Sequence, residues 1–140
     1  MIFDASSIYA LVRARRLSLL ADGKTLDLAF YELGNALWKE VTVFKSMSLD
    51  SSLKLLSTML RILNLMDRVS TAELKAEEIL KLATHSGLTF YDSSYLYAAM
   101  SLGEELVTED ARLRRSADKL GVKAYTCGEL LRRFETKAHE

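Results

Sequence analysis

Short apolar runs alternate with longer stretches of helical periodicity along this chain. Apolar side chains that recur every three or four residues are typical of helices that bury one face, and short apolar runs between turn residues are typical of buried strands. The pattern predicts strands at Met1–Asp4, Thr25–Phe30, Glu105–Thr108 and Val122–Thr126. It predicts helices at Ser6–Leu20, Tyr31–Lys45, Leu49–Leu65, Thr71–Ser86, Asp92 to near Gly103, Asp110–Leu120 and Glu129 to about Thr136.

Strands and helices that alternate in this way predict a parallel α/β sheet with helices on both faces. Right-handed crossovers bring the carboxyl end of every parallel strand to the same edge of the sheet. Ligands of such sheets bind at that edge. The residues that directly follow each predicted strand are therefore the first candidates for a functional site.

The composition predicts one folded domain over residues 1–140. The chain is 49% apolar, which is enough for a substantial core, and no linker, repeat or low-complexity run divides it. Basic and acidic side chains balance at 19 each, so any contact with RNA must depend on local patches of charge. A single cysteine, Cys127, excludes an intramolecular disulfide, and together with two histidines it is too few for a structural zinc site.

The sequence also predicts a cytoplasmic protein that contacts no membrane. No apolar run approaches the roughly 20 residues that a membrane-spanning helix needs. The amino-terminal residues MIFDASS carry an acidic side chain where a signal peptide has a basic start and an apolar run.

Four carboxylates stand where an apolar run gives way to a predicted helix: Asp4, Glu32, Asp92 and Asp110. Each one taken alone has an ordinary explanation, because aspartate is a favoured helix cap and acids suit the first helical turn. Taken together they repeat one placement, and they are expected to converge at the carboxyl edge of the sheet. Converging carboxylates repel one another, and a hard divalent cation with oxygen ligands offsets that repulsion. The chemistry favours Mg²⁺ or Mn²⁺.

The order of these acids along the chain resembles the PIN-domain family, which includes the VapC-type toxins of toxin–antitoxin pairs. The resemblance covers nearly the whole chain and departs from many members at Ser93, where they carry alanine. Four short motifs carry it: Asp4-Ala5-Ser6, Glu32-Leu33-Gly34-Asn35, Tyr91-Asp92-Ser93-Ser94-Tyr95 and Thr108-Glu109-Asp110.

The resemblance implies a three-layer α/β/α fold around a central parallel sheet, and Mg²⁺- or Mn²⁺-dependent endoribonuclease activity. It implies that Asp4, Asp92 and Asp110 are metal ligands, directly or through water. Glu32 would bind a second metal ion or position the attacking water. The side chains expected to hold these carboxylates in place are Ser6, Asn35 and Thr108, for which ordinary capping and turn chemistry is the other interpretation.

Two further features concern partners. Arg13, Arg112 and Arg115 lie on helices that start beside the expected site, where they would contact RNA phosphates or simply form a solvated face. The segment Leu53–Met66 is apolar on more than one helical face. A homodimer interface, a groove for an antitoxin protein or a fully buried helix would each explain that excess.

Other classes of function fit the sequence less well. Receiver domains require adjacent acids after the first strand, and aspartate-nucleophile phosphatases require Asp-x-Asp, but Ser6 follows Asp4 by two positions. An RNA-processing PIN nuclease without an antitoxin, and a catalytically inactive PIN-like binding module, remain as alternatives to the toxin.

Overall fold

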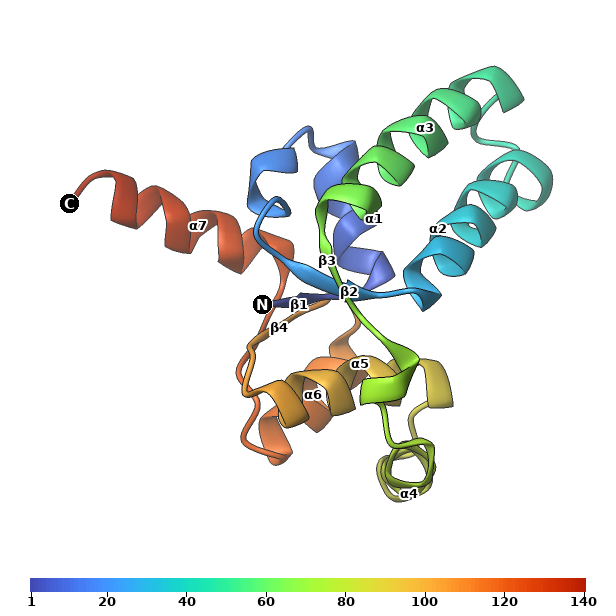
Figure 1. Cartoon of the computed structure of the whole chain (residues 1–140). Helices are drawn as coiled ribbons and strands as arrows, with labels where there is room; N and C mark the ends of the chain where they lie inside the picture. Colours follow the sequence, from blue (N-terminus) through green and yellow to red (C-terminus); the bar gives the residue numbers. More distant parts are fainter.

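A five-stranded parallel sheet forms the centre of the computed structural model, which describes residues 1–140 (Figure 1). The strand order is β3-β2-β1-β4-β5, and every neighbouring pair is parallel. The strands are β1 (Ile2–Phe3), β2 (Lys24–Leu26), β3 (Asp67–Val69), β4 (Leu106–Val107) and β5 (Ala124–Tyr125). The α/β fold with a central parallel sheet is therefore confirmed.

Helices cover both faces of the sheet. In Figure 1, the helices α1 (Ala5–Arg13), α2 (Leu28–Trp38) and α3 (Leu49–Leu65) lie on one face of the sheet. The opposite face carries α4 (Ala76–Ser86), α5 (Phe90–Leu102) and α6 (Ala111–Lys119). The last helix, α7 (Cys127–Ala138), extends away from the sheet toward the carboxyl terminus. The three layers follow from this arrangement.

Each face of the sheet has its own apolar core. Phe3 and Val107 contribute to the core beneath α1, α2 and α3, whereas Ile2 and Leu106 contribute to the core beneath α5 and α6. Successive side chains of a strand point to opposite faces. Two-residue strands that are buried on both sides therefore connect the two cores directly.

Two predicted boundaries near the first crossover were wrong. The first helix ends at Arg13 instead of Leu20, because Arg15 adopts a left-handed conformation (φ 57°) that an α-helix cannot continue through. A short 3₁₀ helix at Leu17–Leu19 follows. The second strand ends at Leu26, and the apolar run after it begins α2. Short apolar runs fit a strand or a buried helix equally well, so periodicity could not decide this boundary.

Three further elements differ from the sequence prediction. The edge strand β3 was not predicted, because three residues give no periodicity and two of them are exposed. The predicted helix Thr71–Ser86 is divided into a 3₁₀ turn at Thr71–Glu73 and the helix α4, with Leu74 extended between them. The helix predicted at Tyr31–Lys45 is α-helical only as far as Trp38 and continues as a π-helix over Lys39–Val43.

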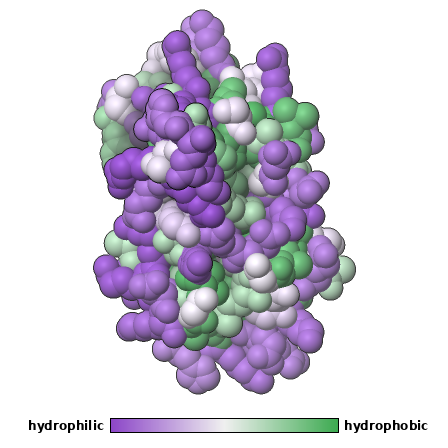
Figure 2. Space-filling model, turned by 90° about the vertical axis from the view of Figure 1, so that its left-hand side faces the viewer, coloured by the Kyte–Doolittle hydropathy of each residue, from purple (hydrophilic) through white to green (hydrophobic).

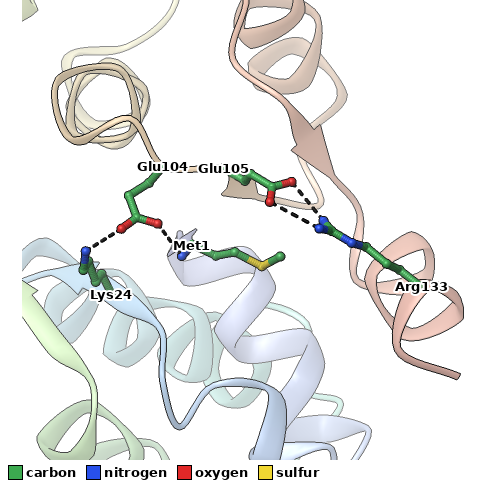
Figure 3. Close-up of polar contacts among 5 residues, drawn as sticks. All are labelled: Met1, Lys24, Glu104, Glu105 and Arg133. Carbon is green, nitrogen blue, oxygen red and sulfur yellow. Dashed lines mark hydrogen bonds and ion pairs between the residues drawn. The ribbon is translucent and has the colours of Figure 1, made fainter. Parts of the chain in front are cut away.

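Ion pairs close the amino-terminal edge of the sheet (Figure 3). The Glu104 carboxylate accepts hydrogen bonds from the Lys24 ammonium and, at 2.7 Å, from the amino group of Met1. These two cations lower the pKa of Glu104 to about 2. Arg133 on α7 donates to both oxygens of Glu105, at 2.9 and 3.4 Å. Strand starts and the last helix are thereby tied together on the side opposite to the expected site.

The surface combines charged and apolar regions. The face shown in Figure 2 is mostly hydrophilic, with smaller hydrophobic areas among the charged side chains. None of the helices has both the length and the apolar character that crossing a bilayer requires. At the tip formed by α2, the π-helix and α3, large apolar side chains are exposed, namely Trp38, Val43, Phe44, Leu49 and Leu53.

Candidate active site

The four predicted carboxylates come from four elements at the carboxyl edge of the sheet. Asp4 directly follows β1 and caps α1, and Asp110 follows β4 and caps α6. Glu32 lies in the second turn of α2 instead of directly after a strand, and Asp92 lies in the first turn of α5, which Thr89 caps. The structure thus brings together side chains that are separated by more than a hundred positions in the sequence.

Asp4 is held by a dense set of hydrogen bonds. Its Oδ1 accepts from the Ser6 hydroxyl at 2.8 Å and from the Ser7 backbone N–H at 2.9 Å, and its Oδ2 accepts from the Thr108 hydroxyl at 2.5 Å. Only 4% of Asp4 is exposed. Burial raises the pKa of this carboxyl, and the three donors oppose that increase. Ser6 and Thr108 therefore hold a buried carboxylate in one orientation.

Thr108 connects this carboxylate to the loop that carries Asp110. The Thr108 hydroxyl accepts from the Asp110 backbone N–H at 3.0 Å, and Arg114 donates to the Thr108 carbonyl oxygen at 2.9 Å. Asp110 in turn accepts from the Leu113 N–H at 3.0 Å through one carboxylate oxygen. The loop between β4 and α6 is thus fixed at both of its ends.

Glu109 has a role in this loop that the sequence did not predict. Its Oε1 accepts from the Cys127 backbone N–H at 2.6 Å, and its own backbone N–H donates to the Ser6 hydroxyl at 3.0 Å. Glu109 directly precedes Asp110, the N-cap of α6, and that position in the sequence gave no signal of these contacts. Glu109 joins the starts of α1 and α7 to the site.

Glu32 is paired with Tyr95, a second residue that sequence reasoning missed. The buried Tyr95 hydroxyl on α5 donates to Glu32 Oε1 on α2 at 2.8 Å. Burial raises the pKa of the Glu32 carboxyl, the hydrogen bond from Tyr95 lowers it, and repulsion from Asp4 and Asp92 raises it further. Asn35 lies one helical turn after Glu32 and lines the same surface hollow.

Asp92 also lies near other acids of this set. Burial raises the pKa of its carboxyl, and repulsion from Asp110 and Asp4 adds to that increase. Thr89 and Arg112 act in the opposite direction. Asp92 therefore lies within electrostatic reach of Asp4 and Asp110, and Glu32 lies within reach of Asp4 and Asp92.

The donor set suits a hard divalent cation. All four groups are carboxylates, and none of the ion pairs in the structure involves them. No group of three or more histidine, cysteine, aspartate or glutamate side chains is close enough together to hold a metal ion as the side chains stand. Carboxylates without a cation between them repel one another. Oxygen donors of this kind match Mg²⁺ and Mn²⁺, so the residues fit such an ion by their chemistry.

The three arginines considered either as RNA contacts or as a solvated face are placed differently from one another. Arg112 is exposed and donates to the Gly87 carbonyl oxygen at 2.9 Å, which ties α6 to the end of α4. Arg13 donates to the Tyr9 hydroxyl at 3.3 Å, and its guanidinium lies 5.8 Å from the centre of the Tyr9 ring. Arg115 is exposed on α6 beside Asp118. Arg112 and Arg13 both have partners within the chain.

The sequence pattern of the PIN domain matches residues 1–119 of this chain. The chain belongs to the PIN-domain family. Similarity to individual members extends over most of its length. It is 36% identical over 114 residues to exonuclease VapC9 of Pyrobaculum aerophilum, which covers 79% of this chain and 80% of the relative. It is 31% identical over 121 residues to ribonuclease VapC3 of the same organism, which covers 81% of this chain and 91% of the relative.

A solved structure resembles this PIN domain over nearly its full length. The crystal structure of PAE2754 from Pyrobaculum aerophilum superposes with a TM-score of 0.78 at 32% sequence identity. The similarity covers 96% of both chains. The arrangement of layers described above is therefore that of a solved relative.

Proposed function

We propose that this PIN domain is a metal-dependent endoribonuclease, formed as a single domain over residues 1–140. One observation carries the proposal: four carboxylates come from four elements at the carboxyl edge of the sheet, and none of them forms an ion pair with a cationic side chain. Acids placed near one another repel, and a binding module would gain nothing from that cost, whereas a divalent cation bound between the carboxylates offsets it. The relatives named as an exonuclease and a ribonuclease support a nuclease, and internal cleavage is the part of the proposal that the experiment below decides.

Mg²⁺ or Mn²⁺ would be held by Asp4, Asp92 and Asp110, with Glu32 as a further ligand or as the group that positions the attacking water. Such an ion lowers the pKa of a bound water and stabilises negative charge on a phosphoryl oxygen. The protein's own contribution is orientation. Ser6 and Thr108 fix the Asp4 carboxylate, and the Tyr95 hydroxyl leaves the second oxygen of Glu32 available to accept a proton or a water hydrogen.

We further propose that the protein is the toxin of a toxin–antitoxin pair and acts on RNA in the cytoplasm as a homodimer. Both curated relatives carry VapC names. The exposed apolar tip between α2 and α3 supplies a surface that water solvates poorly, and such surfaces mark contacts with other chains. A second copy, or an antitoxin chain, would cover it.

Cleavage of an end-labelled linear RNA and of a covalently closed circular RNA tests the activity. With Mg²⁺ or Mn²⁺ the wild type should cut both substrates. Only an endonuclease can open the circular RNA, because that RNA has no ends. Asp92→Asn should remove most of the cleavage, whereas Asp118→Asn, an exposed aspartate near the end of α6, should retain it. Equal cleavage in EDTA would exclude the metal mechanism, and cleavage of the linear RNA alone would exclude the endonuclease.

A further inference from the structure

A surface hollow of about 540 Å³ lies directly beside Glu32. Its lining comes from residues 28–35 of α2 and from the first turn of α5, and Figure 1 shows the starts of these two helices on the same side of the molecule. The lining residues are Leu28, Tyr31, Glu32, Asn35 and Tyr91. The hollow therefore combines two aromatic rings, one amide and one of the proposed catalytic carboxylates.

The side chains of both tyrosines in this hollow are mostly exposed to solvent. Tyr31 is 70% exposed and Tyr91 is 58% exposed. Neither contributes to the apolar cores of the two sheet faces. Their exposed aromatic surface is therefore available to a ligand.

The Tyr31 ring is also held in place by a neighbour. Phe30 meets it edge to face, with the ring centres 5.1 Å apart and the planes at 84°. Edge-to-face pairs of this kind are favourable arrangements for aromatic rings. A ring supported from one side loses less freedom when a ligand stacks on its other side.

We propose that this hollow is a subsite for one unpaired nucleobase of the RNA substrate, which stacks on Tyr31 and Tyr91 next to the phosphate to be cleaved. The inference rests on the proposed ribonuclease function. Every nucleobase offers a flat π-face, and stacking on aromatic side chains is the common way in which proteins hold single-stranded RNA. The Asn35 amide supplies both a donor and an acceptor for the edge of that base.

The polar part of the lining distinguishes a base from an apolar side chain of a protein partner. An apolar group in the hollow would bury the Glu32 carboxylate and the Asn35 amide against carbon, which leaves polar groups without partners. A base offers hydrogen-bonding atoms along its edge to these same groups. A second hollow, of about 260 Å³, adjoins the first at Leu28 and Tyr91 and is lined mainly by apolar residues. That second hollow lacks Glu32 and Asn35.

The test uses a short single-stranded RNA that carries one 2-aminopurine, whose fluorescence is quenched when it stacks. Titration in EDTA keeps the proposed cleavage from proceeding. Tyr31→Leu and Tyr91→Leu remove the aromatic face and should each weaken quenching and binding roughly 5- to 100-fold. Tyr91→Phe keeps the face and should bind like the wild type. Phe134→Leu, an exposed aromatic residue on α7, is the matched control and should also bind like the wild type.

The outcomes separate this inference from the proposed function. If the wild type cleaves RNA with metal ions, and the leucine variants quench fluorescence and cleave as the wild type does, the subsite is overturned and the nuclease proposal stands. Quenching that depends on both tyrosines, in a protein that never cleaves RNA, would support the subsite and refute the nuclease. Equal affinity of the wild type for the single-stranded RNA and for a fully paired duplex would also overturn the subsite. Leucine variants that change only the sedimentation coefficient would overturn it in favour of a protein interface.

Discussion

The Tyr95 hydroxyl donates a 2.8 Å hydrogen bond to Glu32 Oε1 and thereby joins two helices that lie on opposite faces of the sheet. Glu32 belongs to α2, whose buried residues pack in one core, and Tyr95 belongs to the other core. The contact passes around the carboxyl edge, where the other proposed metal ligands lie. Tyr95 is therefore a positioning residue for Glu32.

Tyr95→Phe should reduce kcat about tenfold and change KM little, because the ring still packs while Glu32 loses the group that orients it. The free energy of unfolding should fall by about 1 kcal/mol for the lost hydrogen bond. Tyr97→Phe on the same helix is the control, because this change removes no hydrogen bond to any of the proposed metal-binding carboxylates. Single-turnover cleavage and urea denaturation measure the two effects. An unchanged kcat would show that Tyr95 has only a packing role.

Asp92→Asn should stabilise the protein in EDTA, because burial, together with repulsion from Asp110 and Asp4, disfavours the charged Asp92 in the folded state. The expected gain is about 1 kcal/mol after solvent screening, or a few degrees in the melting temperature. With excess Mg²⁺ the wild type should gain more than the variant does. Asp110→Asn should show the same pattern, because asparagine also caps helices well and the start of α6 is therefore kept. If both variants melt like the wild type in both buffers, the acids do not share a site.

Ser93→Ala should leave stability unchanged or raise it by about 1 kcal/mol. The Ser93 hydroxyl is buried without a hydrogen-bond partner, and its removal eliminates an unsatisfied polar group. The adjacent Ser94 is the matched control, because its hydroxyl donates to the Phe90 carbonyl oxygen at 2.8 Å. Ser94→Ala should therefore destabilise the fold. Denaturant midpoints of the two variants measure this difference. A larger loss of stability for Ser93→Ala than for Ser94→Ala would contradict the absence of a hydrogen-bond partner for Ser93.

Glu104→Gln should destabilise the protein by about 1–2 kcal/mol at neutral pH. The pKa of Glu104 is lowered from 4.5 to about 2, mainly by Lys24. A lowered pKa contributes stability that is fully present above pH 4.5 and is lost as pH falls through 2. The difference between variant and wild type should therefore shrink over that interval in denaturation series. Glu135→Gln, an exposed glutamate on α7, should show no such dependence.

The exposed apolar tip predicts the assembly state. Phe44 and Leu49 are more than 60% exposed, and burying them in a homodimer removes that surface from water. Phe44→Glu and Leu49→Glu should each convert a dimer into a monomer in sedimentation velocity. Leu80→Glu, an equally exposed residue on α4, should leave the dimer intact. A wild type that sediments as a monomer at micromolar concentration would refute the homodimer.

Sequence reasoning was strongest where a feature depends on neighbours in the chain. Asp4 and Asp110 were expected after strands, and both follow strands and cap helices, because a strand end and the next helix start are local events. The boundary before Glu32 was placed wrongly. A short apolar run around Phe30 carries the same pattern in a strand and in a buried helix, and only packing in the core selects between them.

The sequence by itself determined the alternation of helices with four of the five strands and the parallel sheet, and it singled out the four carboxylates that the proposed site uses. The tertiary structure decided that Tyr95 contacts Glu32 across 63 positions and that Tyr31 and Tyr91 line one hollow. It also decided that the leucines of α3 are partly buried and partly exposed, so neither a fully buried helix nor a single apolar face describes it. These features depend on how helices rotate and meet over the sheet. Periodicity along one segment records which residues are apolar, whereas the distance between two segments is set by the packing of both cores.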